Sequence, residues 1–267
     1  MDTELSKLHT LDILLAEELK RICEKHKIKY FMIAGTLLGA VRHRGFIPWD
    51  DDMDFGMRRV EFERFVEVCS YELNSEKFQL QTMYTEKEYP FNFVKITLKG
   101  TSIIEEFSKG KLKNNGIFID IFPVDNVSDN NIKAFFQMRL FWLFRNLLLI
   151  KLGYGEKTKK FYTFGRIVAS LFSVQFLKYM KETVIKCANS EISKKVIVSD
   201  GTYGLEKETI EAKWVDNTTV YKFEKSEFPG IEACDEYLSY FYGDYMIPPK
   251  ENNRNHHNRI KIDFGPY

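Results

Sequence analysis

The amino-acid sequence predicts an α/β protein in which a mixed sheet is flanked by helices and followed by a mainly helical C-terminal part. In the first half, segments with the 3.6-residue period of amphipathic helices alternate with short runs typical of strands. From about residue 130 to 190 the pattern is helical. A chain of 267 residues, 44% hydrophobic and 15% aromatic, can bury a sizeable core.

The first half is expected to alternate helices with strands. Apolar residues recur at helical spacing near the N-terminus, at Leu8, Leu11, Leu15, Leu19 and Ile22. A short helix follows the turn at Gly35 and ends at Gly45, and "DMDFGM" alternates acidic with apolar residues as a half-buried strand does. Longer helices are expected over residues 4–25 and 60–73, and strands over 28–33, 52–57, 91–98, 102–107 and 116–124.

The second half is expected to begin with helices and to become mixed later. After the helical stretch, "KKVIVS" and "TVYKFEKSEF" have the composition of extended segments, and "CDEYLSYFYGDYM" is expected to be helical. No repeat, low-complexity segment or flexible linker is evident.

Composition and charge exclude several classes of protein. A formal net charge of +1 gives no indication of a nucleic-acid partner. Four scattered cysteines disfavour a zinc site and are typical of reduced thiols in a cytosol. The N-terminus lacks the apolar core of a signal peptide, and Arg139 and Arg145 interrupt the most apolar segment, residues 135–152. We therefore expect a cytoplasmic protein, with contact at the inner face of the membrane left open.

Residues 50–54, "DDDMD", place four carboxylates in one five-residue window. Like charges this close repel one another unless solvent or cations neutralise them. Side chains two apart on a strand share a face, so Asp52 and Asp54 point the same way. A third carboxylate, Asp120, stands among apolar residues of another predicted strand. The three form an oxygen-only ligand set suited to one or two Mg²⁺ ions, with Mn²⁺ as a substitute.

Two other interpretations of the acidic window are weaker. An EF-hand calcium loop matches at several ligand positions, but Phe55 stands where that motif requires glycine. An acidic surface turn without a metal is disfavoured because Met53 and Phe55 give the segment the pattern of a strand.

Gly35 and Thr36 follow an apolar strand and open a helix, so their backbone amides can cradle a phosphate. Such a pair is common by itself, but here it comes shortly before the paired aspartates. The combination "AGT…DMDF…FIDIF" resembles the nucleotidyltransferase superfamily. That resemblance implies a nucleotidyltransferase-like mixed sheet.

The segment "GTLLGAVRHRGFIPWDDDMDFGM" resembles the LicD family of phosphotransferases more narrowly, a family that includes fukutin and the fukutin-related protein. The similarity extends to "FVKI", "GIFIDIFPVDNV" and "YLSYFYGDYMIPP", near both ends of the chain. Members transfer a phosphorylated alcohol from a CDP-linked donor to a sugar hydroxyl. The helical stretch 130–190 is the least family-like, and alcohol specificity is expected there.

The resemblance implies that Asp52, Asp54 and Asp120 are catalytic and hold Mg²⁺ around the donor's pyrophosphate. Asp120 is also expected to take the proton from the acceptor hydroxyl. The acceptor oxygen attacks the phosphorus next to the alcohol, and CMP leaves. Catalysis of this kind consists mainly of positioning and charge neutralisation.

Further residues are expected to bind the substrate, each with a plainer alternative. Arg42 can reach donor phosphates or form a salt bridge with the aspartates, and Lys95 faces the same cleft or is an ordinary edge-strand lysine. Trp49 can stack on cytosine, cover a quaternary ammonium group, or simply pack. The basic tail is either solvated or closes its His256–His257 pair over the donor. The full substrate-binding set is Gly35, Thr36, Arg42, Trp49, Asp50, Lys95, His256 and His257.

The sequence thus predicts a Mg-dependent phosphotransferase that moves phosphocholine from CDP-choline, or a phospho-alcohol from another CDP-alcohol, to a sugar hydroxyl and releases CMP. The acceptor is expected to be a cell-surface glycan such as teichoic acid or capsule, or a lipid-linked oligosaccharide docked at Arg139 and Arg145. The alternatives are ribitol- or glycerol-phosphate transfer, and an NTP-dependent nucleotidyltransferase that releases pyrophosphate. A non-catalytic relative is disfavoured because all three aspartates are intact.

We expect residues 1–128 to form the nucleotidyltransferase-like catalytic core. Residues 129–267 are expected to form a helical substrate-binding part packed on that core, with a C-terminal segment that returns to the active site. The aromatic residues of the helical part are predicted to be mostly core, with a choline cage or a lipid contact as alternatives. They are Phe135, Phe136, Phe141, Trp142, Phe144, Tyr162 and Phe164.

Overall fold

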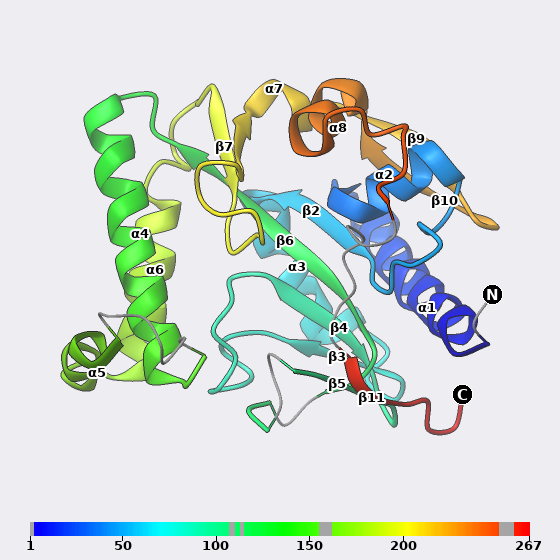
Figure 1. Ribbon diagram of the computed structural model, residues 1–267, viewed down its shortest axis with the longest axis horizontal. Coiled ribbons are helices and arrows are strands. Elements are labelled where there is room, and N and C mark those ends of the chain that lie inside the picture. The colour runs from blue at the N-terminus through cyan, green and yellow to red at the C-terminus, as the bar shows by residue number, and fades with distance from the viewer. Residues whose placement is uncertain (1–2, 107–109, 113–114, 155–161, 251–258) are drawn as a thin grey trace.

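The computed structural model describes residues 3–106, 110–112, 115–154, 162–250 and 259–267. Figure 1 shows a twisted sheet through the centre of the molecule, helices packed along it, and a group of three helices at one end. The chain is an α/β protein with a mixed parallel and antiparallel sheet, which confirms the predicted fold class.

Nine of the described strands form one sheet in the order β3-β4-β6-β2-β1-β10-β9, and β7 extends it from β6 to β8. Their bounds are β1 Phe31–Met32, β2 Asp54–Arg58, β3 Phe78–Gln81, β4 Val94–Leu98, β6 Phe118–Val127, β7 Lys195–Val198, β8 Thr209–Glu211, β9 Thr218–Phe223 and β10 Ser226–Ile231. β2 is parallel to β6 and β1 to β10, whereas the other pairs are antiparallel. β5 (Ser102–Glu105) and β11 (Arg259–Asp263) form a separate two-stranded sheet.

The helices fall into a set around the sheet and a set at its end. The first set is α1 Thr3–His26, α2 Ala34–His43, α3 Arg59–Glu72, α7 Ala212–Val215 and α8 Cys234–Tyr242. α1 and α3 pack against each other and against the central strands, and α2 packs between β2, β9 and α8. The second set is α4 Asn131–Lys151, α5 Tyr162–Ser170 and α6 Val174–Lys186, which pack together beside β6 (Figure 1).

One hydrophobic core joins the sheet to α1 and α3. Leu15 and Leu19 of α1 and Phe55 of β2 are completely buried in it, as the spacing of the apolar residues predicts. Each large apolar side chain buried in this way contributes about 1.5–3 kcal/mol relative to an exposed one. The core therefore fixes the strands whose other face carries the acidic residues.

Most predicted elements are confirmed with small changes of boundary. The predicted helices 4–25 and 60–73 correspond to α1 and α3. The run 219–228 is a hairpin of β9 and β10 rather than one extended segment, and Glu224 at its turn has a φ of 54°. Short elements that sequence analysis did not predict are β3, β8, α7 and β11.

The prediction that the aromatic residues of the helical stretch are mostly core is wrong. Phe135, Phe136, Trp142 and Phe164 are each more than half exposed, whereas Phe141 is completely buried. The reason is that α4 packs on α6 and on the sheet through the face that carries Phe141. The other face of α4 is left outside the core.

The division of the chain at residue 128 stays a prediction. β7 to β10 of the second half belong to the same sheet as the strands of the first half, so the sheet extends across that boundary. α4, α5 and α6 form a helical group, and β11 near the C-terminus pairs with β5. No helix among the described residues is both long and apolar enough to cross a membrane.

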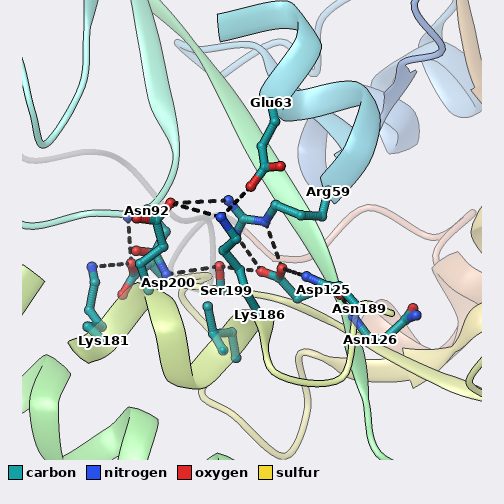
Figure 2. A network of polar contacts seen from close by, with 12 residues as sticks. Arg59, Glu63, Asn92, Asp125, Asn126, Lys181, Lys186, Asn189, Ser199 and Asp200 are labelled. Atoms are coloured by element: carbon teal, nitrogen blue, oxygen red, sulfur yellow. Dashed lines mark hydrogen bonds and ion pairs between the residues drawn. The ribbon is translucent and has the colours of Figure 1, made fainter. Parts of the chain in front are cut away.

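A buried polar network joins α3, the sheet and the helical group (Figure 2). The guanidinium of Arg59 donates two hydrogen bonds, of 2.7 and 2.6 Å, to the carboxylate of Asp125 on β6. Both side chains are almost completely buried. Asn189, just beyond α6, donates a further hydrogen bond to Asp125 at 2.7 Å. This ion pair therefore ties the helix that follows β2 to the strand beside it.

We expect Asp125→Asn to reduce the free energy of unfolding by about 3–5 kcal/mol, because it leaves the buried Arg59 guanidinium without its carboxylate. The matched control is Glu63→Gln, which removes an exposed ion pair with Lys186 in the same network and is expected to cost about 1 kcal/mol or less. Urea unfolding of both variants measures the difference. Equal losses would contradict a special role for the buried pair.

Candidate active site

A cavity of about 670 Å³ opens beside the N-terminus of α2, over the strands β4, β6 and β2. It collects eight of the eleven residues that the sequence predicts for the site. They are Gly35, Arg42, Trp49, Asp50, Asp52, Asp54, Lys95 and Asp120. Thr36 lies beside the cavity rather than in its lining, and His256 and His257 lie outside the described residues.

Strand register places Lys95, Asp120 and Asp54 side by side on three adjacent strands. Asp54 of β2 is paired with Asp120 of the parallel strand β6, and Asp120 is paired with Lys95 of the antiparallel strand β4. Residues directly opposite each other on neighbouring strands have their side chains on the same face. The row exists because "DMDF" and "FIDIF" lie next to each other in the sheet.

Lys95 is the basic member of this row. Its Nζ lies 2.8 Å from Oδ1 of Asp120 and 3.1 Å from the centre of the Phe118 ring. Both Lys95 and Asp120 are buried. The alternative of an ordinary edge-strand lysine is wrong, because β4 lies between β3 and β6 inside the sheet.

The carboxylates of the cavity raise one another's pKa values. Burial, and then the charges of Asp52, Asp120 and Asp50, raise the pKa of Asp54 well above its usual value. Burial also raises the pKa of Asp120 to about 6, although Lys95 works in the opposite direction. A group of carboxylates that raise one another's pKa values in this way suits a divalent cation.

Gly35 and Thr36 position the acidic strand at the start of α2. The backbone N–H of Asp54 donates to Oγ1 of Thr36 at 2.7 Å, and Ile33 N–H donates to the Asp54 carbonyl at 3.1 Å. A Cβ atom on Gly35 would lie only 2.6 Å from Oδ2 of Asp50, so only glycine allows that carboxylate to approach the helix. Contact of Gly35 and Thr36 with a phosphate stays a prediction.

The tightest group of carboxylates among the described residues is Asp50, Asp51 and Asp52, whose oxygens lie within 4.8 Å of one another. Asp51 is buried, and its carboxylate forms an ion pair of 2.5 Å with Arg259 of β11. Asp51 is therefore already neutralised and does not line the cavity. β2 begins at Asp54 and leads directly into α3, so the segment is not the loop of an EF-hand.

Arg42 and Trp49 line the cavity on the α2 side. The guanidinium of Arg42 donates to His43 Nε2 at 2.9 Å and to the Tyr245 carbonyl at 2.6 Å, so its described hydrogen bonds do not go to the aspartates. Trp49 is half-buried and also packs against the core. Contact of Arg42 and Trp49 with a ligand stays a prediction.

The opposite wall contains polar residues that sequence analysis did not place in the site. Arg145 of α4 donates from Nε to Asp200 Oδ1 at 2.7 Å, and both residues line the cavity. Lys181 Nζ and the Asn92 backbone N–H also donate to Asp200, at 3.0 and 2.8 Å (Figure 2). Burial opposes the charge of Asp200, but Lys181 and Arg145 outweigh it and lower its pKa.

Aromatic side chains form much of the remaining wall. The rings of Tyr203 and Tyr242 are 6.2 Å apart and perpendicular, and both lie in the cavity. Beside them is Glu208, which accepts a hydrogen bond from Tyr203 N–H at 3.0 Å and whose pKa burial raises to about 7. At the other end, Phe91 and Phe93 are stacked 4.9 Å apart. The only sequence indication was the aromatic content of "DGTYG" and "YLSYFYGDYM" near predicted element ends.

Comparison with known proteins shows which family the chain resembles. Residues 27–146 match the family model described as LicD/FKTN/FKRP, nucleotidyltransferase domain. The chain is 31% identical over 243 residues to the lipopolysaccharide cholinephosphotransferase LicD of Haemophilus influenzae, covering 88% of this chain and 89% of that protein.

Two further similarities are shorter. An uncharacterized protein of Rickettsia typhi is 43% identical over 54 residues, which is 20% of this chain and 18% of that protein. A second one, from Rickettsia prowazekii, is 51% identical over 43 residues, or 16% of each chain.

We expect Asp54→Asn to stabilise the metal-free protein at pH 7.5, because it removes a carboxylate whose ionisation is opposed first by burial and then by three neighbouring aspartates. An increase in the melting temperature of about 2–4 °C corresponds to about 1 kcal/mol in a protein of this size. A raised folded-state pKa means that the native protein binds more protons than the unfolded chain as the pH falls from neutral. The wild-type protein should therefore gain stability on acidification, and the difference should shrink.

Differential scanning fluorimetry in EDTA, at several pH values, measures this effect. The matched control is Asp216→Asn, which changes an exposed aspartate and is expected to be nearly neutral. A lower melting temperature for Asp54→Asn would show that its carboxylate is stabilised rather than strained.

Proposed function

We propose that this chain transfers phosphocholine from CDP-choline to a sugar hydroxyl of a glycan. The premise is that the chain belongs to the LicD family and is a LicD-type phosphotransferase. The observation that carries the proposal is the cavity that Asp52, Asp54 and Asp120 line together. The name of the similar H. influenzae protein, a lipopolysaccharide cholinephosphotransferase, supports both the phosphocholine group and a glycan acceptor.

Asp52, Asp54 and Asp120 would hold Mg²⁺, as one or two ions, with Mn²⁺ as a substitute. The ligand set fits because it offers only carboxylate oxygens. Burial, and then the charges of Asp52 and Asp120, raise the pKa of Asp54, and a bound cation would offset this effect. When bound, Mg²⁺ neutralises negative charge on the oxygens of the transferred and leaving phosphates.

The residues of the chain bind and orient the two substrates. The N-terminus of α2, beginning at Ala34, directs backbone N–H groups and a positive helix dipole toward the donor phosphates. Arg145 is held by Asp200 through Nε, so its two Nη groups can contact a phosphate or an acceptor hydroxyl. Lys95 keeps Asp120 in place from the neighbouring strand.

Asp120 serves as the general base of the transfer. With a pKa of about 6 it is mostly ionised at neutral pH, and it can accept the proton of the acceptor hydroxyl. The acceptor oxygen forms a bond to the phosphorus next to choline, the bond from that phosphorus to the CMP oxygen breaks, and CMP leaves with the electron pair. The reaction consumes no oxidant and needs no covalent intermediate.

The aromatic wall supports choline as the transferred alcohol. Quaternary ammonium groups bind over the faces of aromatic rings, where the electrostatic attraction does not depend on hydrogen bonds. Tyr203 and Tyr242, with the carboxyl group of Glu208 beside them, and Trp49 on the α2 side, offer such faces in the cavity. Ribitol and glycerol would instead need several hydrogen-bonding groups, which makes transfer of their phosphates the second candidate.

We expect Asp52→Asn to lower kcat by about 10³-fold or more with the fold intact, since loss of electrostatic stabilisation of this kind has a large effect on phosphoryl transfer. The assay follows CMP release and incorporation of labelled choline into a glycan acceptor, with and without EDTA. The matched control is Glu61→Gln, which changes an acidic residue that pairs with Arg64 outside the cavity.

Activity that survives both Asp52→Asn and EDTA would contradict the proposal. Release of pyrophosphate from an NTP, without use of CDP-choline, would indicate a nucleotidyltransferase instead.

A further inference from the structure

The outer face of α4 is an exposed apolar stripe. Its five apolar residues are each at least 40% exposed and recur at helical spacing: Ile132, Phe135, Phe136, Leu140 and Leu143. Arg139 lies in the same stripe and extends over the Phe135 ring, 5.4 Å from its centre. An apolar face of this extent on a soluble protein usually marks an interaction surface.

The opposite face of α4 is fully used by the fold. Phe141 and Leu148 are completely buried against neighbouring elements, and Arg145 reaches the active-site cavity. The outer stripe therefore lies on the side of α4 away from the core. Among the described residues, one side of α4 packs on the protein and lines the cavity, whereas the other side is apolar and exposed.

α5 repeats this arrangement next to α4. Phe164 and Ile167 of α5, and Leu171 just after it, are each more than 60% exposed and lie three and four residues apart. Lys151 at the end of α4 donates to the Ala169 carbonyl at 2.9 Å, which ties the two helices together. Figure 1 shows the group of α4, α5 and α6 at one end of the sheet.

The charge of this region is strongly one-sided. Between residues 130 and 172 the only acidic residue is Glu156, although the whole chain has a net charge of only +1. The basic residues of the same stretch are Lys133, Arg139, Arg145, Lys151, Lys157, Lys159, Lys160 and Arg166. The described side chains of Lys133, Arg139 and Arg166 are exposed. Lys133 lies 3.8 Å from Glu191 in an exposed ion pair, so the basic charge of the described surface comes mainly from Arg139 and Arg166.

We propose that the outer faces of α4 and α5 dock the protein on an anionic phospholipid bilayer. Helices that lie in a membrane interface combine Phe, Trp and Leu on one face with Lys and Arg around it. The cytoplasmic leaflet is negatively charged and attracts such basic segments. The combination of an exposed apolar stripe with basic side chains around it favours a lipid surface.

Docking through this face has a consequence for the active site. Arg145 lies on the side of α4 opposite the stripe and lines the catalytic cavity, so a membrane-bound α4 would hold that cavity close to the bilayer. A glycan acceptor attached to a lipid would then reach it without leaving the membrane. The inference goes beyond the proposed function and does not depend on it, because binding can be measured without any donor or acceptor.

The test is co-sedimentation of the purified protein with two kinds of vesicle. One contains phosphatidylcholine alone, and the other also contains about 30% phosphatidylglycerol to represent an anionic leaflet. We expect at least about tenfold stronger binding to the anionic vesicles, which weakens as added NaCl screens the charges. The double variant Phe136→Ser/Leu143→Ser should lose about tenfold or more, and Arg139→Glu should remove the preference for anionic lipid.

The matched control is Val60→Ser/Tyr71→Ser, which removes two equally exposed apolar side chains from α3 and should bind like the wild type. Thermal unfolding confirms that each variant is folded. Equal binding by both double variants, or no vesicle binding at all, would overturn the proposal. So would a dimer in lipid-free solution that Phe136→Ser/Leu143→Ser converts to a monomer, since the stripe would then be a protein interface.

Discussion

The repulsion among buried carboxylates is the constraint on which the rest of this structure depends. Asp54 and Asp120 are held opposite each other by the register of two parallel strands, with Asp52 and Asp50 close by. A fold that forces like charges together loses stability in the absence of a cation, and so needs a rigid scaffold. The completely buried core beneath β2 and β6 supplies that scaffold. Affinity for a divalent cation is the benefit that we propose for the same arrangement.

The second half of the chain completes the site from the other side. The ion pair of Arg59 with Asp125 and the hydrogen bonds of Asp200 connect the helical group to the sheet. Through Asp200 the same network orients Arg145 toward the cavity. Thus α4 serves two surfaces at once, the cavity on its inner side and the apolar stripe on its outer side. The proposed substrate binding and the proposed membrane contact would in this way be joined in one helix.

Local sequence patterns were sufficient to predict the acidic site but not its surroundings. Asp54 and Asp120 could be found because each breaks the apolar pattern of a strand, and strand period dictates the direction of the side chains. Asp52 was expected on the same strand as Asp54, but β2 begins at Asp54, so Asp52 lies just before the strand. Asp200 and Glu208 could not be found, because they follow or precede short strands whose place in the sheet depends on long-range pairing. The aromatic residues of α4 were assigned to the core since hydrophobicity alone does not tell which face of a helix is covered.

The most direct test of the central claim is a thermal-shift titration with CDP-choline, CDP-glycerol and CTP, each with and without Mg²⁺. A ligand that binds only the folded state stabilises it by about 2.7 kcal/mol at one hundred times its Kd. The structure predicts a clear increase in melting temperature with CDP-choline that requires Mg²⁺ and is absent in Asp52→Asn. A shift with CTP but none with CDP-choline, or a CDP-choline shift that ignores Mg²⁺ and the aspartate, would contradict the claim.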